Sequence, residues 1–591
     1  MHPFSLHFII ATALATAAAT FFSKGWRRRL FAFVVVPGAF YTFFYNFNYC
    51  IINSTSAIVM SYGGAVYTCL SFLFLASFKT TGVCESAEKK LYLKTTLLFV
   101  LQFLAVLYAV AIPWAIDTFP MSNVEAVLFT VFAGANEGAE EFVISSIASG
   151  VIIPAIKLFS IIVAVQVAFA IALSRMDKGF VFTLWKISYT FSPGPFKNCF
   201  FFLGKGGLVF LVLYSVALSL VLPGIVLSAP FRTLFQIPVD SKLYRNHYVH
   251  PDSLNLELPK NPKNLIVIMM ESMETNFKKF TPEIAELQNE NTNFAPGGVS
   301  VAGTGWTIAG ITGKLCGIPL NMPMGITEYL GTLPTYLPGA KCMMELLREQ
   351  GYEQEFLQGS SGNFTQINDF CKWHGDVTLH DLDYYRDRGD LPKDYKVFWG
   401  FEDRKLYEYA KRDLDSLYSM KKPFALYMFT IDTHQPAGYV DEQCSKEFSS
   451  VEKQFPKALL CASKQLSDFI AWAKQQPWYE NTVISVMGDH TMAMLSPKAD
   501  ISPSDSLFWT NFIINSAQTS SVRERSYSSL DMFPTLLEAM GFDLKNRSAG
   551  LGRSLYSDSL TLLEVYGRER FDVLLRERSV QYDEFLMGKK K

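Results

Sequence analysis

The chain has 591 residues, half of them hydrophobic, and its 53 basic and 54 acidic residues nearly cancel. This length exceeds that of one domain, and the even charge balance gives no basic patch of the kind that nucleic-acid binding needs. Apolar residues dominate positions 1–230, whereas positions 231–591 have the mixed composition of a globular domain. The composition therefore predicts a membrane anchor followed by a globular domain, with no nucleic acid as partner.

Six stretches of the first 230 residues are apolar and about 20 residues long, which is the length that a membrane-spanning helix needs. Asn46, Asn48, Asn53 and Ser54 interrupt the pair formed by the second and third of them, at 30–78. The six stretches lie at residues 4–22, 30–52, 56–78, 94–116, 151–173 and 205–228. The sequence thus predicts a transmembrane domain of about six helices over residues 1–230.

The distribution of Lys and Arg orients these predicted helices. Basic residues gather at 24–29, 79–94 and 175–205, whereas the alternate loops at 53–56 and 117–150 contain no Lys or Arg. Basic loops stay on the cytoplasmic side, so an even number of spans places residues 231–591 outside the cytoplasm. A cleaved signal peptide does not explain the first stretch, because no Lys or Arg precedes it and further spans follow.

Five of the nine cysteines lie in the predicted external domain, where an oxidising compartment permits disulfides. Spacing alone does not fix their connectivity. We predict the pairs Cys316–Cys342 and Cys444–Cys461, which leaves Cys371 free. The alternative is that all five thiols are reduced and buried.

Residues 231–261 are rich in Pro, Asn and charged residues, so we predict a linker there. The runs "NLIVIMMES", "PFALYMFTIDTH" and "NTVISVMGDH" follow it along the chain, and "SLFWTNFIINS" adds a fourth. Short continuous apolar runs are typical of strands that are buried on both faces. Segments with helical spacing, such as "AKCMMELLREQGY", lie between them. Strands alternating with helices predict an α/β layered domain over residues 262–591.

Three of these predicted strands end in carboxylates and imidazoles. The first is followed by Glu271, the second by Asp432 and His434, and the third by Asp489 and His490. Ligands of open α/β sheets bind outside the carboxyl ends of the strands, so we expect these side chains to converge. Carboxylate oxygens and imidazole nitrogens bind zinc or manganese. Each residue alone also fits a helix cap or a buried structural role, but together they favour a site.

The run "GTGWTIAG", which begins at Gly303, precedes a predicted helix, "TIAGITGKL". A nearby metal would lower the pKa of the Thr307 hydroxyl and make it a nucleophile. The N–H groups at the start of a helix also favour a phosphate. Gly303 and Gly305 would allow close backbone approach, and Gly310 would let the helix pack tightly. The alternative is an ordinary glycine-rich turn in which Thr304 or Thr307 caps the helix.

The order of "IMMES", "GTGWTIAG", "IDTHQP" and "MGDH" resembles the alkaline-phosphatase-like, sulfatase-fold transferases of lipid headgroups. Within them it is most similar to the periplasmic glucan phosphoglycerol transferases and lipoteichoic acid synthases. The most specific motifs are "GTGWTIAG…CGIPL", "DTHQPAGY…C" and "DMFPTLLEAMG". The resemblance covers about residues 262–556 and the plan of a multi-span anchor, although such relatives usually have five spans. It implies a sulfatase-like α/β domain with a central mixed, mostly parallel sheet.

The resemblance also implies roles for individual residues. Thr307 would attack phosphorus and form a phosphothreonine intermediate, and His434 would contact the transferred group or assist proton transfer. A divalent metal, zinc or manganese, would be held by Glu271, Thr307, Asp489 and His490. Substrate-binding residues would be Trp306, Lys372, Trp373 and His374.

The implied function is a membrane-bound, metal-dependent phosphotransferase of the bacterial inner (cytoplasmic) membrane, with its catalytic domain in the periplasm or outside. It would move phosphoglycerol from phosphatidylglycerol to a hydroxyl of a periplasmic glycan or lipid, and diacylglycerol would leave first. The main alternative is a phosphoethanolamine transferase that uses phosphatidylethanolamine and acts on lipid A or another envelope glycan. The acidic loop "FAGANEGAEEF" would then hold the ammonium group, or it is simply solvated.

Two further classes are less consistent with the sequence. A phosphatase or sulfatase-like hydrolase is the first, but sulfatases form their aldehyde nucleophile from a Cys-x-Pro-x-Arg or Ser-x-Pro-x-Arg run, and residues 262–556 contain no such run. A transporter or receptor with an inert external domain would leave the metal-ligand set unexplained. The predicted spans also carry few of the charged residues that mark a transport path.

Overall fold

The computed structural model describes residues 88–118, 147–175, 180–184, 187–191, 195–221, 239–321, 336–435, 437–492, 508–519, 524–577 and 579–587. Two compact units divide these residues. The described residues up to 221 belong to the first unit, and those from 239 onward belong to the second.

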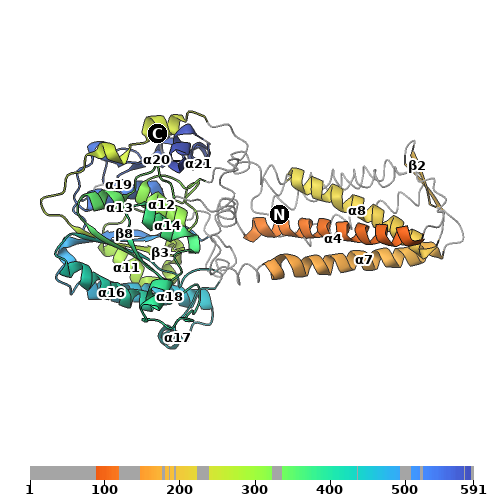
Figure 1. Ribbon diagram of the computed structural model, residues 1–591, viewed down its shortest axis with the longest axis horizontal. Helices are drawn as coiled ribbons and strands as arrows, with labels where there is room; N and C mark the ends of the chain where they lie inside the picture. Colours follow the sequence, from red (N-terminus) through yellow and green to blue (C-terminus); the bar gives the residue numbers. More distant parts are fainter. Residues whose placement is uncertain are drawn as a thin grey trace. The chain divides into compact units, whose positions relative to one another are not determined.

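Three long helices make up most of the described part of the first unit (Figure 1). They are α4 (Glu88–Thr118), α7 (Ile153–Ser174), which continues a π-helical turn (Ala148–Ile152), and α8 (Phe196–Val221). A hairpin of β1 (Phe180–Leu184) and β2 (Ile187–Phe191) precedes α8. Val106, Ala155 and Leu211 form a small shared core.

Two stretches of these helices are long and apolar enough to cross a membrane, Lys94–Ala111 and Ala148–Ile171. Their outward faces carry exposed apolar side chains such as Leu97, Ile161 and Phe169. A helix that is apolar on all sides fits lipid better than water. The predicted spans at 94–116 and 151–173 thus coincide with helices, and that at 205–228 coincides with α8 as far as it is described. The first three predicted spans lie outside the described residues, so the six-span plan stays a prediction.

A mixed, mostly parallel six-stranded sheet forms the centre of the second unit, with strand order β5-β4-β6-β3-β7-β8. Every neighbouring pair is parallel except β7 and β8, which are antiparallel. The strands are β3 (Asn264–Met270), β4 (Glu353–Gln358), β5 (Thr378–His380), β6 (Phe424–Phe429), β7 (Thr482–Gly488) and β8 (Asn511–Ile514). The predicted fold class of this domain is confirmed.

Helices cover both faces of this sheet (Figure 1). Alternate residues of β3 belong to different cores: Leu265 and Val267 pack in one, Ile266 and Ile268 in the other. Successive side chains of a strand point to opposite faces, which explains why all seven residues of β3 are apolar or buried. The first core includes residues of α12 (Thr307–Cys316), α13 (Met343–Glu349), α14 (Ile367–Trp373) and α19 (Met532–Ala539). The second core includes residues of α11 (Pro282–Glu290), α15 (Leu382–Asp387), α16 (Asp403–Ser419) and α18 (Gln454–Ala473).

Short elements complete the second unit. The helices are α10 (Lys242–His247), α17 (Glu442–Glu447), α20 (Leu562–Tyr566), α21 (Arg568–Leu575) and α22 (Val580–Met587). Single 3-10 turns lie at Pro251–Leu254, Thr275–Phe280, Phe364–Gln366, Tyr479–Asn481, Ser529–Asp531 and Lys545–Arg547, and β9 (Ser548–Ala549) pairs with β10 (Gly552–Arg553).

The predicted linker is folded over its described part. In α10, Leu243 and Tyr244 are buried, and the Tyr244 ring lies 6.1 Å from that of Tyr582 in α22. The Val249 peptide also exchanges hydrogen bonds with Gly550. Residues 239–261 therefore belong to the second unit. Apolar side chains such as Leu243, Tyr244 and Leu254 are buried there, although the segment also contains Pro, Asn and charged residues.

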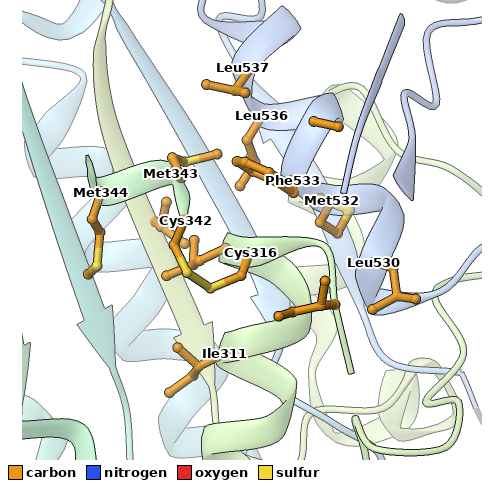
Figure 2. Packing of buried hydrophobic residues seen from close by; sticks show 14 of the residues in the cluster. Ile311, Cys316, Cys342, Met343, Met344, Leu530, Met532, Phe533, Leu536 and Leu537 are labelled. Atoms are coloured by element: carbon orange, nitrogen blue, oxygen red, sulfur yellow. A yellow bond between two sulfur atoms is a disulfide. The ribbon is translucent and has the colours of Figure 1, made fainter. Parts of the chain in front are cut away.

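Both predicted disulfides are present, Cys316–Cys342 and Cys444–Cys461, and Cys371 is a free, buried thiol. Figure 2 shows Cys316–Cys342 joining the end of α12 to the start of α13, close to Met343 and to Phe533 of α19. This disulfide therefore lies inside the first core, and it holds α12 at its C-terminal end.

Candidate functional site

The candidate site lies at the carboxyl ends of two neighbouring strands. Strands β3 and β7 are parallel, and Met270 pairs with Gly488. The next residues are Glu271 and Asp489, so the register places these two carboxylates side by side. The ligand atoms of Glu271, Asp489 and His490 lie within 4.8 Å of one another, and all three side chains are buried.

The N-terminus of α12 brings Thr307 to the same place. Thr307 is the first residue of this helix, and its hydroxyl donates a hydrogen bond to Glu271 Oε2 at 3.4 Å. Gly310, one turn further on, makes this approach possible, because a Cβ at that position would lie 2.2 Å from the Asp489 carbonyl oxygen. The glycine therefore lets the helix pack directly on the backbone of Asp489.

Buried charge dominates the electrostatics of this cluster. Burial, and then the neighbouring Asp489, raises the pKa of Glu271 above its ordinary value, while His490 and the hydroxyls of Ser272 and Thr307 act in the opposite direction. Asp489 Oδ1 accepts hydrogen bonds from the N–H groups of Ser272 and His490, both at 2.7 Å. Asp489 Oδ2 has no hydrogen-bond partner in the part of the chain that the structure describes.

These residues fit a divalent metal ion. Asp489 Oδ2 accepts no hydrogen bond from the described residues and lies 3.3 Å from His490 Nε2. A buried carboxylate oxygen in this state, next to a second carboxylate, is an unfavourable arrangement that a cation would relieve. His490 Nδ1 donates a hydrogen bond to the Thr491 carbonyl at 2.8 Å. This bond fixes the ring and leaves Nε2 free to bind a metal, which is the arrangement that metal-binding histidines commonly have. Two carboxylates, one imidazole and a hydroxyl suit zinc or manganese.

His434 lies after the end of β6, and the residue before it contacts the end of β3. The hydroxyl of the preceding Thr433 donates to the Glu271 carbonyl at 2.6 Å. His434 Nδ1 donates to the Gln435 carbonyl at 2.8 Å, so Nε2 is the nitrogen that accepts. Burial lowers the pKa of His434 to about 4, and the charge of Asp489 opposes this shift. The imidazole is therefore neutral near pH 7.

An aromatic wall, formed by Phe364, Phe398 and Trp399, surrounds His434. The ring centroids of Trp399, Phe364 and Phe398 lie 4.3, 6.3 and 6.5 Å from that of His434. Sequence reasoning missed these three residues, because they come from two segments that carry no recognisable motif. The wall accounts for the desolvation that keeps His434 neutral.

Asp432 does not join the other strand-end residues, so the expected convergence is wrong at this position. Its Oδ2 accepts a hydrogen bond from the N–H of Asp403 at 3.0 Å. The Asp403 carboxylate in turn accepts from the N–H groups of Ile431 and Asp432. The two aspartates thus join the end of β6 to the start of α16, which is the capping role that a lone carboxylate after a strand commonly has.

The four predicted substrate-binding residues occupy different places. Trp306 is buried and lies directly before Thr307. Trp373 is 38% exposed and Lys372 is exposed, both on α14. His374 is buried away from solvent, and its Nδ1 lies 3.0 Å from Glu345 Oε2. The structure thus joins His374 to α13, not to the ligand set, and the substrate-binding roles stay predictions.

The chain is similar, over part of its length, to curated proteins named phosphoglycerol transferase I. The chain is 28% identical over 318 residues to phosphoglycerol transferase I of Xanthomonas campestris pv. campestris (strain B100), which covers 51% of this chain and 44% of that protein. It is 31% identical over 240 residues to phosphoglycerol transferase I of Escherichia fergusonii, over 39% of this chain and 31% of that protein. The chain thus spans less than half the length of the curated relatives it matches.

Two solved structures are also similar. One is a protein in the alkaline phosphatase superfamily from Vibrio parahaemolyticus, at 22% identity and a TM-score of 0.41 over 56% of this chain and 78% of that chain. The other is the lipoteichoic acid synthase LtaP from Listeria monocytogenes, at 17% identity and a TM-score of 0.41 over 57% and 97%.

The family assignment agrees with the motifs of the sequence. The sulfatase family matches residues 263–542, a range that contains Glu271, Thr307, His434, Asp489 and His490. The predicted resemblance to sulfatase-fold phosphoglycerol transferases is confirmed. Residues 263–542 of this chain form a sulfatase-family domain.

Proposed function

We propose that the protein is a membrane-bound, metal-dependent phosphotransferase that transfers the phosphoglycerol headgroup of phosphatidylglycerol to a hydroxyl of a periplasmic glycan or lipid. The observation that carries the proposal is the position of the Thr307 hydroxyl. It lies at the N-terminus of a buried helix, 3.4 Å from a carboxylate of the Glu271–Asp489–His490 cluster. The names of the curated relatives support the phosphoglycerol group as the one transferred.

The metal and the nucleophile would act at one point. A divalent ion held by Glu271, Thr307, Asp489 and His490 would neutralise charge on the phosphoryl oxygens and lower the pKa of the threonine hydroxyl. The N–H groups at the start of α12 favour the phosphate of the donor. In the first step Thr307 Oγ1 bonds to phosphorus, the bond from phosphorus to the diacylglycerol oxygen breaks, and diacylglycerol leaves.

Each step moves one proton. Thr307 loses its proton as it attacks, and the diacylglycerol oxygen gains one as it leaves. In the second step an acceptor hydroxyl attacks phosphorus, loses its proton, and releases Thr307, which regains one. We assign His434 to the oxygens that enter and leave, because Nδ1 is held by the Gln435 carbonyl and the neutral Nε2 can accept a proton and pass it on.

The same proposal places the domain outside the cytoplasm, next to a bilayer that supplies the lipid. The two disulfides of the domain fit an oxidising compartment. The two apolar helices of the first unit could hold the chain in the membrane.

A parallel lipid assay tests the proposal. The full chain, purified in detergent with manganese or zinc, is incubated with phosphatidylglycerol or phosphatidylethanolamine labelled in the headgroup, and diacylglycerol is measured. We expect diacylglycerol from phosphatidylglycerol and none from Thr307→Ala. Release from phosphatidylethanolamine alone would replace the proposed donor, and free labelled headgroup without transfer to any acceptor would indicate a hydrolase.

A further inference from the structure

Lys314 is a buried residue of the site that the proposed reaction does not use. It lies seven residues after Thr307 on α12, and its side chain is fully buried. Lysines are almost never fully buried unless their ammonium group is paired. The contacts of this ammonium group therefore show what the residue does.

The Lys314 ammonium group lies behind the ligand set. Its Nζ donates to the Asp489 backbone carbonyl at 2.5 Å and to Ser529 Oγ at 3.2 Å. It also lies 4.3 Å from the centre of the Trp509 ring, within the range of a cation–π contact. Of these partners, only Asp489 belongs to the proposed metal site.

The helix repeat explains why one helix can hold both the nucleophile and this lysine at the site. Residues three and seven positions apart lie on the same face of an α-helix, so Thr307, Gly310 and Lys314 face the neighbouring ends of β3 and β7 together. The Thr307 hydroxyl reaches Glu271, Gly310 packs against the Asp489 carbonyl oxygen, and Lys314 donates to that oxygen. Two residues of α12, Gly310 and Lys314, thus contact the end of β7, and Thr307 contacts the end of β3.

Asp489 is held at both ends as a result. Lys314 fixes its peptide carbonyl, and the N–H groups of Ser272 and His490 fix Oδ1 of its side chain. Its other oxygen, Oδ2, accepts no hydrogen bond from the described residues and lies 3.3 Å from His490 Nε2, so it faces the proposed metal site.

We infer that Lys314 is a positioning residue, which holds Asp489 at a fixed place relative to the helix that carries Thr307 and thereby sets the affinity of the site for its metal. The inference rests on the metal site of the proposed function. Removing an outer partner of a metal ligand commonly weakens metal affinity or activity by about 10- to 100-fold. Lys314 donates to the backbone of Asp489, a proposed metal ligand, so we expect its removal to weaken metal affinity by a factor in this range.

Metal binding by the full chain in detergent tests the inference, with zinc and manganese affinities measured by competition with a chelating dye. Lys314→Met removes the donor and keeps an unbranched side chain of similar length, and it should weaken binding by about 10- to 100-fold. Ser529→Ala is the matched control. This change removes the Ser529 hydroxyl, the second hydrogen-bond partner of Lys314 Nζ, and leaves the bond from Nζ to the Asp489 carbonyl. The metal affinity of this variant should therefore stay within about threefold of the parent.

Melting temperatures with and without metal separate positioning from a general loss of stability. If Lys314 only stabilised the fold, Lys314→Met would melt earlier in both conditions and keep the full metal-induced rise. We expect the metal-induced rise itself to shrink. If Lys314→Met does not fold, Lys314→Gln is the test variant, because its shorter amide keeps a buried polar group and should still weaken binding about tenfold.

Two results would overturn the inference in distinguishable ways. A folded Met or Gln variant that binds metal as tightly as the parent would show that Lys314 does not position Asp489, and it would leave the proposed function intact. A parent protein that binds neither zinc nor manganese would overturn the metal site and the proposed function with it.

Discussion

The two threonines of the glycine-rich run differ in the partners of their hydroxyls. Thr304 is fully buried, and its Oγ1 donates to the Val301 carbonyl at 2.8 Å. Its hydroxyl is therefore used to hold the loop. The Thr307 hydroxyl faces Glu271 instead. The family resemblance favoured Thr307 as the nucleophile. The hydrogen bonds support the same assignment independently, because only the Thr307 hydroxyl of these two faces the proposed metal ligands.

Substitution of these threonines should separate their roles. Thr307→Ala removes the nucleophile, so we expect transfer to fall by at least about a thousandfold while metal still binds through Glu271, Asp489 and His490. Thr304→Ala loses one buried hydrogen bond, worth about 1 kcal/mol, and should keep activity within about tenfold of the parent. Rates of diacylglycerol release, with metal affinity measured on the same samples, check both. Robust turnover by Thr307→Ala would contradict the assignment.

Glu355 offers a prediction about pH that is independent of the candidate site. It lies on β4, with its Oε2 3.8 Å from His380 Nδ1, which is 2.8 Å from Asp413 Oδ2. Burial raises the pKa of Glu355 from 4.5 to about 7, His380 opposes the shift, and Asp413 adds to it. The raised pKa means that ionising Glu355 destabilises the folded state. The contribution of Glu355 to the free energy of unfolding is thus largest below about pH 4.5, and it is lost as the pH rises through about 7.

Glu355→Gln should remove this dependence. Relative to the variant, the parent should lose roughly 1–2 kcal/mol of stability between pH 5 and 8, after allowance for partial exposure. Melting temperatures of both proteins across this range measure the difference. Glu442→Gln, at a carboxylate whose side chain is 85% exposed, controls for the loss of one charge. A parent and Glu355→Gln variant whose melting temperatures run parallel would refute the prediction.

At the scale of elements, α12 is the part of the fold on which the site depends most. Its first residue is the proposed nucleophile, its middle packs on Asp489, and its last residue is held by a disulfide. The other face of this helix packs in the first core with α19 (Figure 2). A small displacement of the helix would therefore change the site without unfolding the domain.

Two glycines of α12 allow a matched test of this dependence. At Gly310 a new Cβ would lie 2.2 Å from the Asp489 carbonyl oxygen, whereas at Gly313 it would lie 3.0 Å from the Ser529 side chain. Both changes gain a similar helix propensity of about 1 kcal/mol, so the comparison isolates the contact. Gly310→Ala should lower metal affinity and activity by at least about tenfold, and Gly313→Ala should change them much less. Equal effects on metal affinity would argue against the role of Gly310.

The sequence predicts these elements unevenly, for physical reasons. Strands β3, β6 and β7 were predicted because burial on both faces makes them continuous apolar runs. Strand β4 reads "EQEFLQ" and β5 has three residues, so neither shows an apolar pattern. The contacts of Asp432 were missed because the sequence shows that it follows a strand, but not that the Asp403 N–H at the start of α16 donates a hydrogen bond to its carboxylate. Lys314 was missed because burial of a lysine depends on partners that are far away in the chain.

At the scale of the whole molecule, the orientation of the chain in the membrane is the main prediction. The basic loops at 24–29, 79–94 and 175–205 predict that the sulfatase-family domain lies outside the cytoplasm. Protease added to intact spheroplasts should then remove this domain, while a cytoplasmic marker protein stays intact. Full protection of the domain until the membrane is lysed would reverse the orientation.

The central claim is that a phospholipid headgroup passes through Thr307. The most direct measurement is mass spectrometry of the peptide that contains "GTGWTIAG", after the full chain has been incubated with phosphatidylglycerol and quenched in acid without acceptor. We predict a phosphoglycerol adduct on Thr307, formed together with diacylglycerol and absent when metal is removed by a chelator. An adduct mapped to Thr304, or diacylglycerol release with this peptide unmodified at every time point, would contradict the account.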